Sequence, residues 1–148
     1  MYKYTFDEFK QDIVPFAKKI KEDFNPEALV AVARGGLTLT HALSTCLDNR
    51  NAFALNSVHY DDTKKLDTIK IWNIPDLSNF KRVLIVDDIV DSGDSLNAIK
   101  QEILKLYPHL DVRLAVIFYK QTAIIQPDYM VKQAKQWIDF FWDVRLDG

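Results

Sequence analysis

The sequence contains few of the features that would indicate a secreted, metal-stapled or membrane protein. Its 148 residues include a single cysteine, Cys46, which excludes an internal disulfide and a cysteine metal site. No apolar run reaches the roughly 20 residues of a membrane-spanning helix, and the opening MYKYTFDEFK lacks the pattern of a signal peptide. The net charge of −2 disfavours nucleic-acid binding, which normally needs a basic surface. We therefore expect a cytoplasmic, single-domain protein spanning residues 1–148, with no nucleic-acid partner and no integral membrane segment.

Two common nucleotide-binding motifs are also missing. Neither the GxxxxGK[ST] phosphate loop nor the GxGxxG dinucleotide motif occurs in the sequence. His41, His59 and His109 do not have the spacing of metal ligands, and we expect each to be a surface or core residue. A phosphate site, if there is one, must therefore be built from other residues.

Short apolar runs alternate with amphipathic segments along the chain. Thr5 and Glu8 have capping-box spacing at the start of the first amphipathic segment, and Pro15 is expected to kink or split that helix. Strands that alternate with helices predict an α/β fold, a Rossmann-like parallel sheet with helices on both faces. The expected elements are helices over 6–24, 38–47 and 95–106, and strands over 28–33, 52–58, 69–74, 83–86 and 112–118.

The segment VLIVDDIVDSGDSL, residues 83–96, places three carboxylates just after an apolar strand. Clustered carboxylates raise one another's pKa unless a cation or hydroxyl groups offset their charge, so Asp87, Asp88 and Asp91 indicate a site for Mg²⁺ or sugar hydroxyls. The following serines lead into a predicted helix N-terminus. Backbone N–H groups there, with the hydroxyls of Ser92 and Ser95, are typical of an anion site.

A second candidate anion site follows the strand at 28–33. Arg34 offers a guanidinium there, and the two glycines after it expose backbone N–H groups. Ligands of open parallel sheets bind beyond the carboxyl ends of the strands, so we expect both motifs to share one site. A ribose with a phosphate group at each end fits this pair of sites.

These motifs resemble those of the type I phosphoribosyltransferases, and the resemblance covers nearly the whole chain. VLIVDDIVDSGDSL resembles the signature that binds phosphoribosyl pyrophosphate (PRPP), and ARGGL resembles the pyrophosphate loop. YDDTKKLD lies where the family has a mobile lid, here about 60–68, and AVIFYK resembles a strand that carries a purine-contacting lysine. The tail PDYMVKQAKQWIDFFWD resembles that of bacterial xanthine-guanine phosphoribosyltransferases and implies a small C-terminal hood at about 121–148.

The resemblance implies a role for each PRPP-binding residue. Asp87 and Asp88 would hold the ribose hydroxyls, with Asp88 as the Mg²⁺ contact. Arg34 and Gly35 would hold pyrophosphate, after a cis peptide between Ala33 and Arg34. Asp91 would be the catalytic residue, close to purine N7 and the reacting carbon. The backbone that would hold the 5-phosphate belongs to Ser92, Gly93, Asp94 and Ser95, with the Asp94 carboxylate, unusual in this loop, pointing to solvent.

The resemblance also implies how the base is bound. Trp137 would stack on the purine, the Ile138 backbone would read its edge, and Lys120 would donate to O6. Trp72 and Trp142 are expected to be packing residues. The lid residues would be Tyr60, Lys64 and Lys65, with lysines where similar bacterial enzymes carry an arginine.

The implied reaction is transfer of the 5-phosphoribosyl group from PRPP to a 6-oxopurine (xanthine, guanine or hypoxanthine), with Mg²⁺, in purine salvage by a homodimer or homotetramer. A PRPP-sensing regulator of the same fold is the chief alternative, although the sequence has neither an added DNA-binding domain nor a basic cluster. An adenine or orotate transferase would lack the tryptophan tail. A bacterial receiver domain also begins with a strand like VLIVDD, but it needs about a hundred residues after it, and only some 60 follow Asp88.

Overall fold

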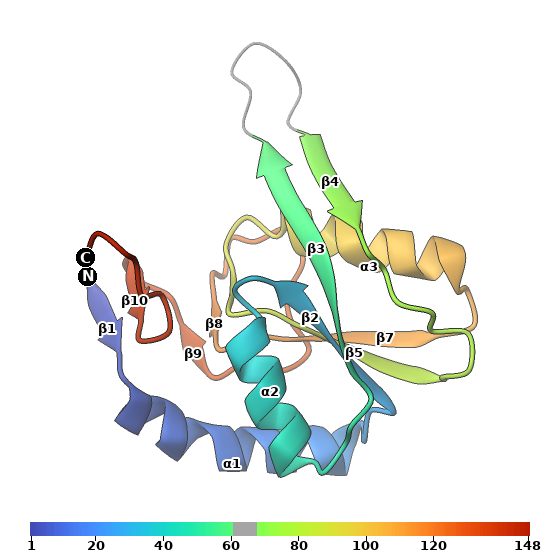
Figure 1. The fold of residues 1–148 in the computed structure, drawn as a ribbon, viewed down its shortest axis with the longest axis horizontal. Coiled ribbons are helices and arrows are strands. Elements are labelled where there is room, and N and C mark those ends of the chain that lie inside the picture. The colour runs from blue at the N-terminus through green and yellow to red at the C-terminus, as the bar shows by residue number, and fades with distance from the viewer. Residues whose placement is uncertain (61–67) are drawn as a thin grey trace.

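A five-stranded sheet forms the centre of the protein, in the order β4-β3-β2-β5-β7 (Figure 1). The computed structural model describes residues 1–60 and 68–148. Neighbouring strands are parallel, except that β3 and β4 pair antiparallel. The strands are β2 (Ala28–Ala33), β3 (Ala52–Tyr60), β4 (Thr68–Trp72), β5 (Arg82–Val86) and β7 (Asp111–Ala115).

The predicted parallel sheet is thus confirmed for four strands, and the prediction is wrong for β4. Chain length explains the difference, because a parallel crossover needs a dozen or more residues. The segment between Tyr60 and Thr68 is shorter than that. β3 and β4 therefore pair as an antiparallel hairpin, and these two strands extend away from the rest of the sheet in Figure 1.

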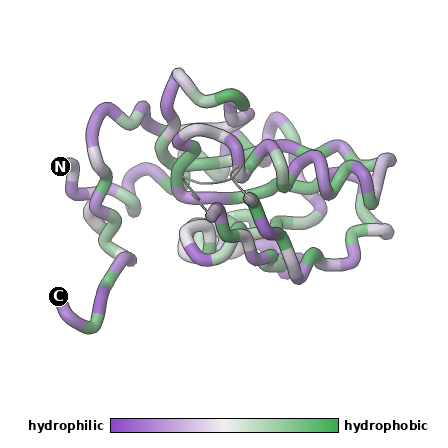
Figure 2. The backbone as a smooth tube through the Cα atoms, turned by 90° about the horizontal axis from the view of Figure 1, so that it is seen from above, coloured by the Kyte–Doolittle hydropathy of each residue, from purple (hydrophilic) through white to green (hydrophobic). Residues whose placement is uncertain are grey.

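Helices cover both faces of the sheet, as the sequence predicts. Side chains alternate along each central strand: Leu29 and Leu84 pack with α1 (Phe6–Asp23) and α2 (Leu37–Cys46). Val30 and Ile85, one residue further along, pack with α3 (Asp94–Leu106) on the opposite face. Figure 2 shows the resulting hydrophobic segments in the middle of the molecule. Among the described helices, none is long and apolar enough to cross a membrane.

The first helix runs unbroken through Pro15, so of the two outcomes expected there, a kink or a split, the split does not occur. Thr5 caps the helix, and its hydroxyl accepts the Glu8 N–H at 3.2 Å. Proline inside a helix costs about 3 kcal/mol. The apolar residues on both sides of Pro15 outweigh that cost, because each large buried side chain contributes roughly 1.5–3 kcal/mol. The buried residues of this helix are Phe9, Ile13, Phe16, Ala17 and Ile20.

The hood contains both ends of the chain. β1 (Tyr2–Tyr4) pairs in parallel with β10 (Ile138–Phe140), so the two termini lie close together (Figure 1). A small parallel sheet of β6 (Ile89–Val90), β8 (Phe118–Tyr119) and β9 (Lys132–Gln133) joins the hood to the central sheet. The N-terminal strand was not expected from the sequence.

The strand expected at 112–118 divides into β7 and β8. The backbone of Asp87 and Asp88 causes the break. The Asp87 N–H donates to the Ala115 carbonyl at 3.1 Å, and the amides of Ile117 and Phe118 both donate to the Asp88 carbonyl. The two predicted acidic residues are therefore fixed where the central sheet ends and the hood begins.

Candidate active site

Three cavities meet at Asp88, beyond the carboxyl ends of β2 and β5. We call them the arginine cleft, which contains Arg34; the serine cavity, which contains Ser92 and Ser95; and the tryptophan cavity, which contains Trp137. Their volumes are about 840, 250 and 480 Å³. The Asp88 side chain lines all three, so a ligand bound there can extend in three directions.

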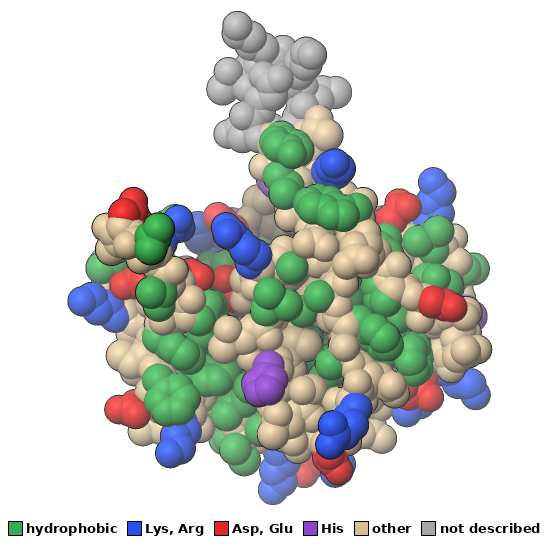
Figure 3. Space-filling view, in the orientation of Figure 1, with side chains coloured by type: hydrophobic (Ala, Val, Ile, Leu, Met, Phe, Trp, Pro, Cys, Tyr) green, Lys and Arg blue, Asp and Glu red, His purple; other side chains and the backbone are tan. Residues whose placement is uncertain are grey.

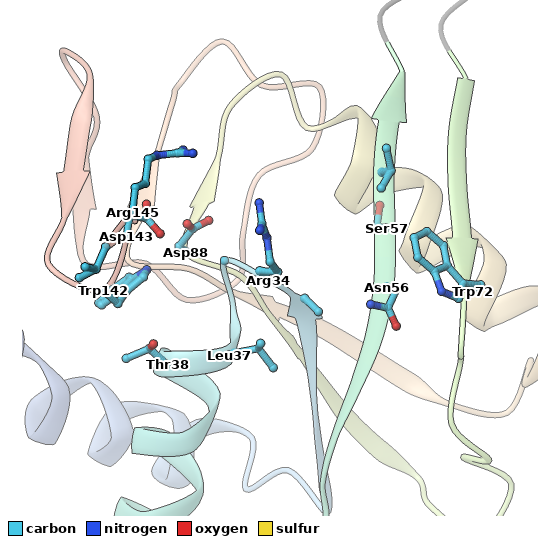
Figure 4. A pocket seen from close by; sticks show the side chains of 14 residues that line it. Arg34, Leu37, Thr38, Asn56, Ser57, Trp72, Asp88, Trp142, Asp143 and Arg145 are labelled. Atoms are coloured by element: carbon cyan, nitrogen blue, oxygen red, sulfur yellow. The ribbon is translucent and has the colours of Figure 1, made fainter. Parts of the chain in front are cut away.

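The arginine cleft lies between the β3–β4 hairpin and the C-terminal tail (Figure 4). The predicted cis peptide between Ala33 and Arg34 is confirmed. Gly35 follows, and a Cβ at this position would lie 2.5 Å from Asp88 Oδ2. Only glycine therefore allows the loop backbone to lie directly against the Asp88 carboxylate. The other polar side chains that line the cleft come from the loop after β2, from α2, from β3 and from the tail after β10: Arg34, Thr38, Asn56, Ser57, Asp143 and Arg145.

The serine cavity lies at the N-terminus of α3. Gly93 has a φ of 88°, a left-handed conformation that favours glycine, and it turns the chain into the helix. The Ser92 hydroxyl accepts the Asp94 N–H at 3.2 Å. Ser92, Gly93 and Ser95 line the cavity, whereas the half-buried Asp94 does not. The helix N-terminus and the serine hydroxyls thus form a small pocket with donors for an anion.

The paired carboxylates beside this cavity differ from ordinary surface acids. Burial, with the charge of the adjacent Asp88, raises the pKa of Asp87 well above its usual range. Burial also raises the pKa of Asp88, and the Asp143 carboxylate adds to that effect. The Asp88 N–H donates to Asp87 Oδ1 at 2.8 Å, and this hydrogen bond partly offsets the rise in the pKa of Asp87. A cation or a set of hydroxyl donors would stabilise the charged pair.

The raised pKa of Asp87 leads to a stability prediction. The folded protein holds this proton to higher pH than the unfolded chain, whose Asp pKa is near 3.9. The free energy of unfolding should therefore fall as the pH rises from the Asp pKa of the unfolded chain to the raised pKa of Asp87 in the folded protein. Asp87→Asn keeps the acceptor for the Asp88 N–H but does not ionise. We expect its Tm to exceed the wild-type Tm at pH 8, by more than at pH 5, in thermal unfolding without ligand.

Titrating groups other than the neighbouring Asp88 contribute equally to both proteins in this comparison, so they cancel. Identical pH profiles for wild type and Asp87→Asn would show that Asp87 ionises normally.

The tryptophan cavity brings together the residues predicted to bind the base. Lys120 Nζ lies 2.7 Å from Asp91 Oδ1, and both residues line the cavity. The Trp137 side chain is 78% exposed, which is unusual for a tryptophan and leaves its ring free to stack. The buried Ile138 follows it in β10. Asp91 also lines the serine cavity, so it lies between the two compartments.

Of the three predicted lid residues, the structure describes only Tyr60. Tyr60 ends β3 and is exposed. Lys64 and Lys65 lie outside the described residues.

Several residues of the site were not predicted from the sequence. Asp143 lines both the arginine cleft and the tryptophan cavity, and Arg145 lines the cleft. Asp143 ends the WI…WD pattern of the tail, so the sequence offered a reason to consider it. Arg145 lies outside that pattern and could not have been predicted from it. His59, expected to be a surface or core residue, is exposed and lines the serine cavity. Trp72, expected to pack, is 41% exposed at the edge of the cleft.

Comparison with known proteins agrees with this geometry. A family model described as "Phosphoribosyl transferase domain" matches residues 5–148. The chain belongs to the phosphoribosyltransferase family. The Helicobacter pylori xanthine-guanine-hypoxanthine phosphoribosyltransferase is 39% identical to this phosphoribosyltransferase, with a TM-score of 0.90 over 99% of this chain and 96% of that chain.

Two further relatives of this phosphoribosyltransferase come from other organisms. A purine phosphoribosyltransferase from Pyrococcus horikoshii is 30% identical, with a TM-score of 0.82 over 97% of this chain and 94% of that one. The xanthine-guanine phosphoribosyltransferase of Cereibacter sphaeroides is 29% identical over 123 residues, which are 80% of this chain and 70% of the relative. The family match and these relatives identify the enzyme as a purine phosphoribosyltransferase.

Proposed function

We propose that this purine phosphoribosyltransferase transfers the 5-phosphoribosyl group from PRPP to a 6-oxopurine in purine salvage. The observation that carries this proposal is Asp88, which lines all three cavities. A ribose over Asp87 and Asp88 would have its 5-phosphate in the serine cavity, its pyrophosphate in the arginine cleft and its anomeric carbon toward the tryptophan cavity. The products would be the nucleoside monophosphate and pyrophosphate.

Each compartment has donors suited to its part of the substrate. Ser92, Ser95 and the α3 N-terminus would bind the 5-phosphate. Arg34 would bind pyrophosphate, since a guanidinium makes paired hydrogen bonds to phosphate oxygens. The backbone at Gly35 would approach the sugar side of the leaving group without a side chain in the way.

A 6-oxopurine suits the tryptophan cavity. The Lys120 ammonium has three donors and no acceptor, so it would donate to the O6 carbonyl. The exposed Trp137 ring would stack on the base, and the Ile138 backbone would read its edge. The names of the Helicobacter and Cereibacter relatives, which specify xanthine and guanine, support this choice of base.

Asp91 would act on the reacting atoms. Its carboxylate lies between the proposed sugar and base sites and is held by Lys120. As the glycosidic bond to pyrophosphate breaks, positive charge develops on the sugar, and a carboxylate there stabilises it. The same group would accept the proton that the purine loses on bonding to the anomeric carbon.

The acidic residues of the site fit Mg²⁺. Burial raises the pKa values of Asp87 and Asp88, with repulsion from Asp88 adding to the shift of Asp87 and repulsion from Asp143 adding to that of Asp88, and a divalent cation would relieve this repulsion. The described residues form no cluster of three or more metal-binding side chains. The pair of carboxylates, Asp87 and Asp88, suits Mg²⁺, which is usually held by one or two carboxylates together with substrate oxygens and water. Asp88 would be its protein contact, and the bound ion would neutralise charge on the leaving group.

We therefore predict that activity depends on Mg²⁺. Pyrophosphate release from PRPP and guanine should be lost in EDTA, because leaving-group charge is then unscreened, and excess Mg²⁺ should restore it. The measurement is a steady-state pyrophosphate assay, with thermal unfolding to confirm that EDTA leaves the protein folded. Full activity in EDTA would contradict the proposed metal role.

The same assay separates an enzyme from a PRPP-sensing regulator. We expect pyrophosphate release with xanthine, guanine or hypoxanthine, and little with adenine or orotate. A regulator would bind PRPP and release no pyrophosphate with any base. On the face shown in Figure 3, Lys and Arg side chains of the described residues are interspersed with Asp and Glu side chains, unlike the basic surface that a nucleic-acid-binding regulator needs.

A further inference from the structure

We propose that Arg145, on the C-terminal tail, is a second pyrophosphate-binding residue that acts together with Arg34. The proposal rests on the proposed function, since it assigns the arginine cleft to the leaving group of PRPP. It assigns a substrate contact to a residue that no sequence motif of the site contains.

The two arginines reach the cleft from distant parts of the chain. Arg34 follows β2, whereas Arg145 lies beyond β10, near the C-terminus. In Figure 4 the Arg145 side chain extends from the tail over Asp88, and Arg34 points into the same space from the opposite wall. A pyrophosphate in this cleft would therefore have a cationic fork on each side.

The tail that carries Arg145 is anchored in the hood. The Trp142 ring stacks on Phe140, with 4.7 Å between centroids and 16° between planes. It also meets Tyr4 and Phe9 edge-on, at 6.1 and 5.6 Å. The Asp143 N–H then donates to the Phe140 carbonyl at 3.0 Å. These contacts fix the backbone three residues before Arg145, so less conformational freedom is lost when its side chain binds an anion.

Charge balance in the cleft gives the second argument. Among the residues that the structure describes, the charged side chains that line it are Arg34, Arg145, Asp88 and Asp143. Without Arg145, a single guanidinium would face two carboxylates as well as a polyanionic ligand. Arg145 brings the side chains to neutrality, so that the cleft no longer repels pyrophosphate.

A polar atom near the base of the tail also lacks a partner. Trp142 lines the cleft, and its buried Nε1–H has no hydrogen-bond acceptor among the described residues. A buried donor of this kind normally bonds to protein, water or ligand. This atom is itself buried, so it adds no donor to the surface of the cleft, and the proposal rests on the two arginines and on the charge balance.

The test is Arg145→Gln, which shortens the charged fork to a neutral amide. We expect the KM for PRPP and the inhibition constant of pyrophosphate each to rise about tenfold, as for loss of an exposed hydrogen bond to a charged group. The KM for guanine should change less than about twofold, because Arg145 does not line the tryptophan cavity. For Arg145→Lys, the KM for PRPP and the inhibition constant of pyrophosphate should lie between those of the wild type and of Arg145→Gln, since lysine keeps the charge and loses the fork.

Arg50→Gln is the matched control. Arg50 is exposed between α2 and β3 and lines none of the three cavities, so its kinetic constants should equal those of the wild type. An Arg145→Gln protein with an unchanged KM for PRPP would overturn the proposal. An equal rise in the KM values for PRPP and guanine would also overturn it, because it would show general damage to the hood.

Direct titration with pyrophosphate separates this proposal from the function on which it rests. Calorimetry of wild type and Arg145→Gln needs no turnover. Suppose that the wild type binds pyrophosphate about tenfold more tightly than Arg145→Gln does, but makes no nucleotide. The proposed function then fails, and the role of Arg145 in anion binding holds. Equal affinities would refute the role of Arg145 even in an active enzyme.

Discussion

Asp91→Asn is expected to lower kcat by about 10²–10⁴ while leaving PRPP affinity almost unchanged. The substitution keeps the shape of the side chain and removes its charge and basicity. Asp91 lies 2.7 Å from Lys120 and faces both the serine and tryptophan cavities, which is where the reacting atoms would meet. The measurements are kcat with a 6-oxopurine and calorimetric binding of PRPP.

Asp48→Asn provides the control for this experiment. Asp48 is exposed after α2 with a φ of 49°, a conformation that asparagine also tolerates. It lies outside the three cavities and should leave kcat unchanged. Near-wild-type turnover by Asp91→Asn would remove Asp91 from the chemistry.

Lys120→Ala should abolish the preference for 6-oxopurines over adenine. A 6-amino group presents donors to an ammonium that also has only donors, so adenine meets repulsion as well as a missing bond. Sites built on hydrogen bonds reject a mismatched analogue by about 10⁴ or more, whereas apolar pockets reach only about 10–200-fold. We expect a large wild-type ratio of kcat/KM for guanine over adenine, and its collapse in the variant through loss of guanine activity.

Lys105→Ala, in the last turn of α3, is the matched control and should keep the wild-type ratio. If Lys120→Ala lowers the rates with both bases by the same factor, the lysine has only a structural role. A wild-type preference for adenine would refute the assignment of the base cavity.

The central elements of the fold could be predicted because local signals and tertiary packing agree there. β2 occupies the residues expected from the apolar run ALVAVA, since both of its faces are covered. The acids after β5 and the arginine after β2 could be expected at one site because the ends of parallel strands share an edge. The cis peptide before Arg34 followed from family resemblance, not from any property of the two residues.

The remaining features depend on contacts between distant segments. β1 exists because residues 2–4 pair with β10 at the other end of the chain, and three residues give no periodicity to detect. The break between β7 and β8 depends on backbone bonds from Asp88, which an apolar run does not reveal. Arg145 is at the cleft only because aromatic packing anchors Trp142.

In the proposed function, PRPP and a purine base meet at Asp88 and react there. The most direct test is mass spectrometry of the quenched reaction with PRPP, Mg²⁺ and xanthine, guanine or hypoxanthine in turn. We expect the corresponding nucleoside 5-monophosphate and pyrophosphate in equal amounts with at least one of these bases. Unchanged substrates with all three bases, or pyrophosphate without any nucleotide, would contradict it.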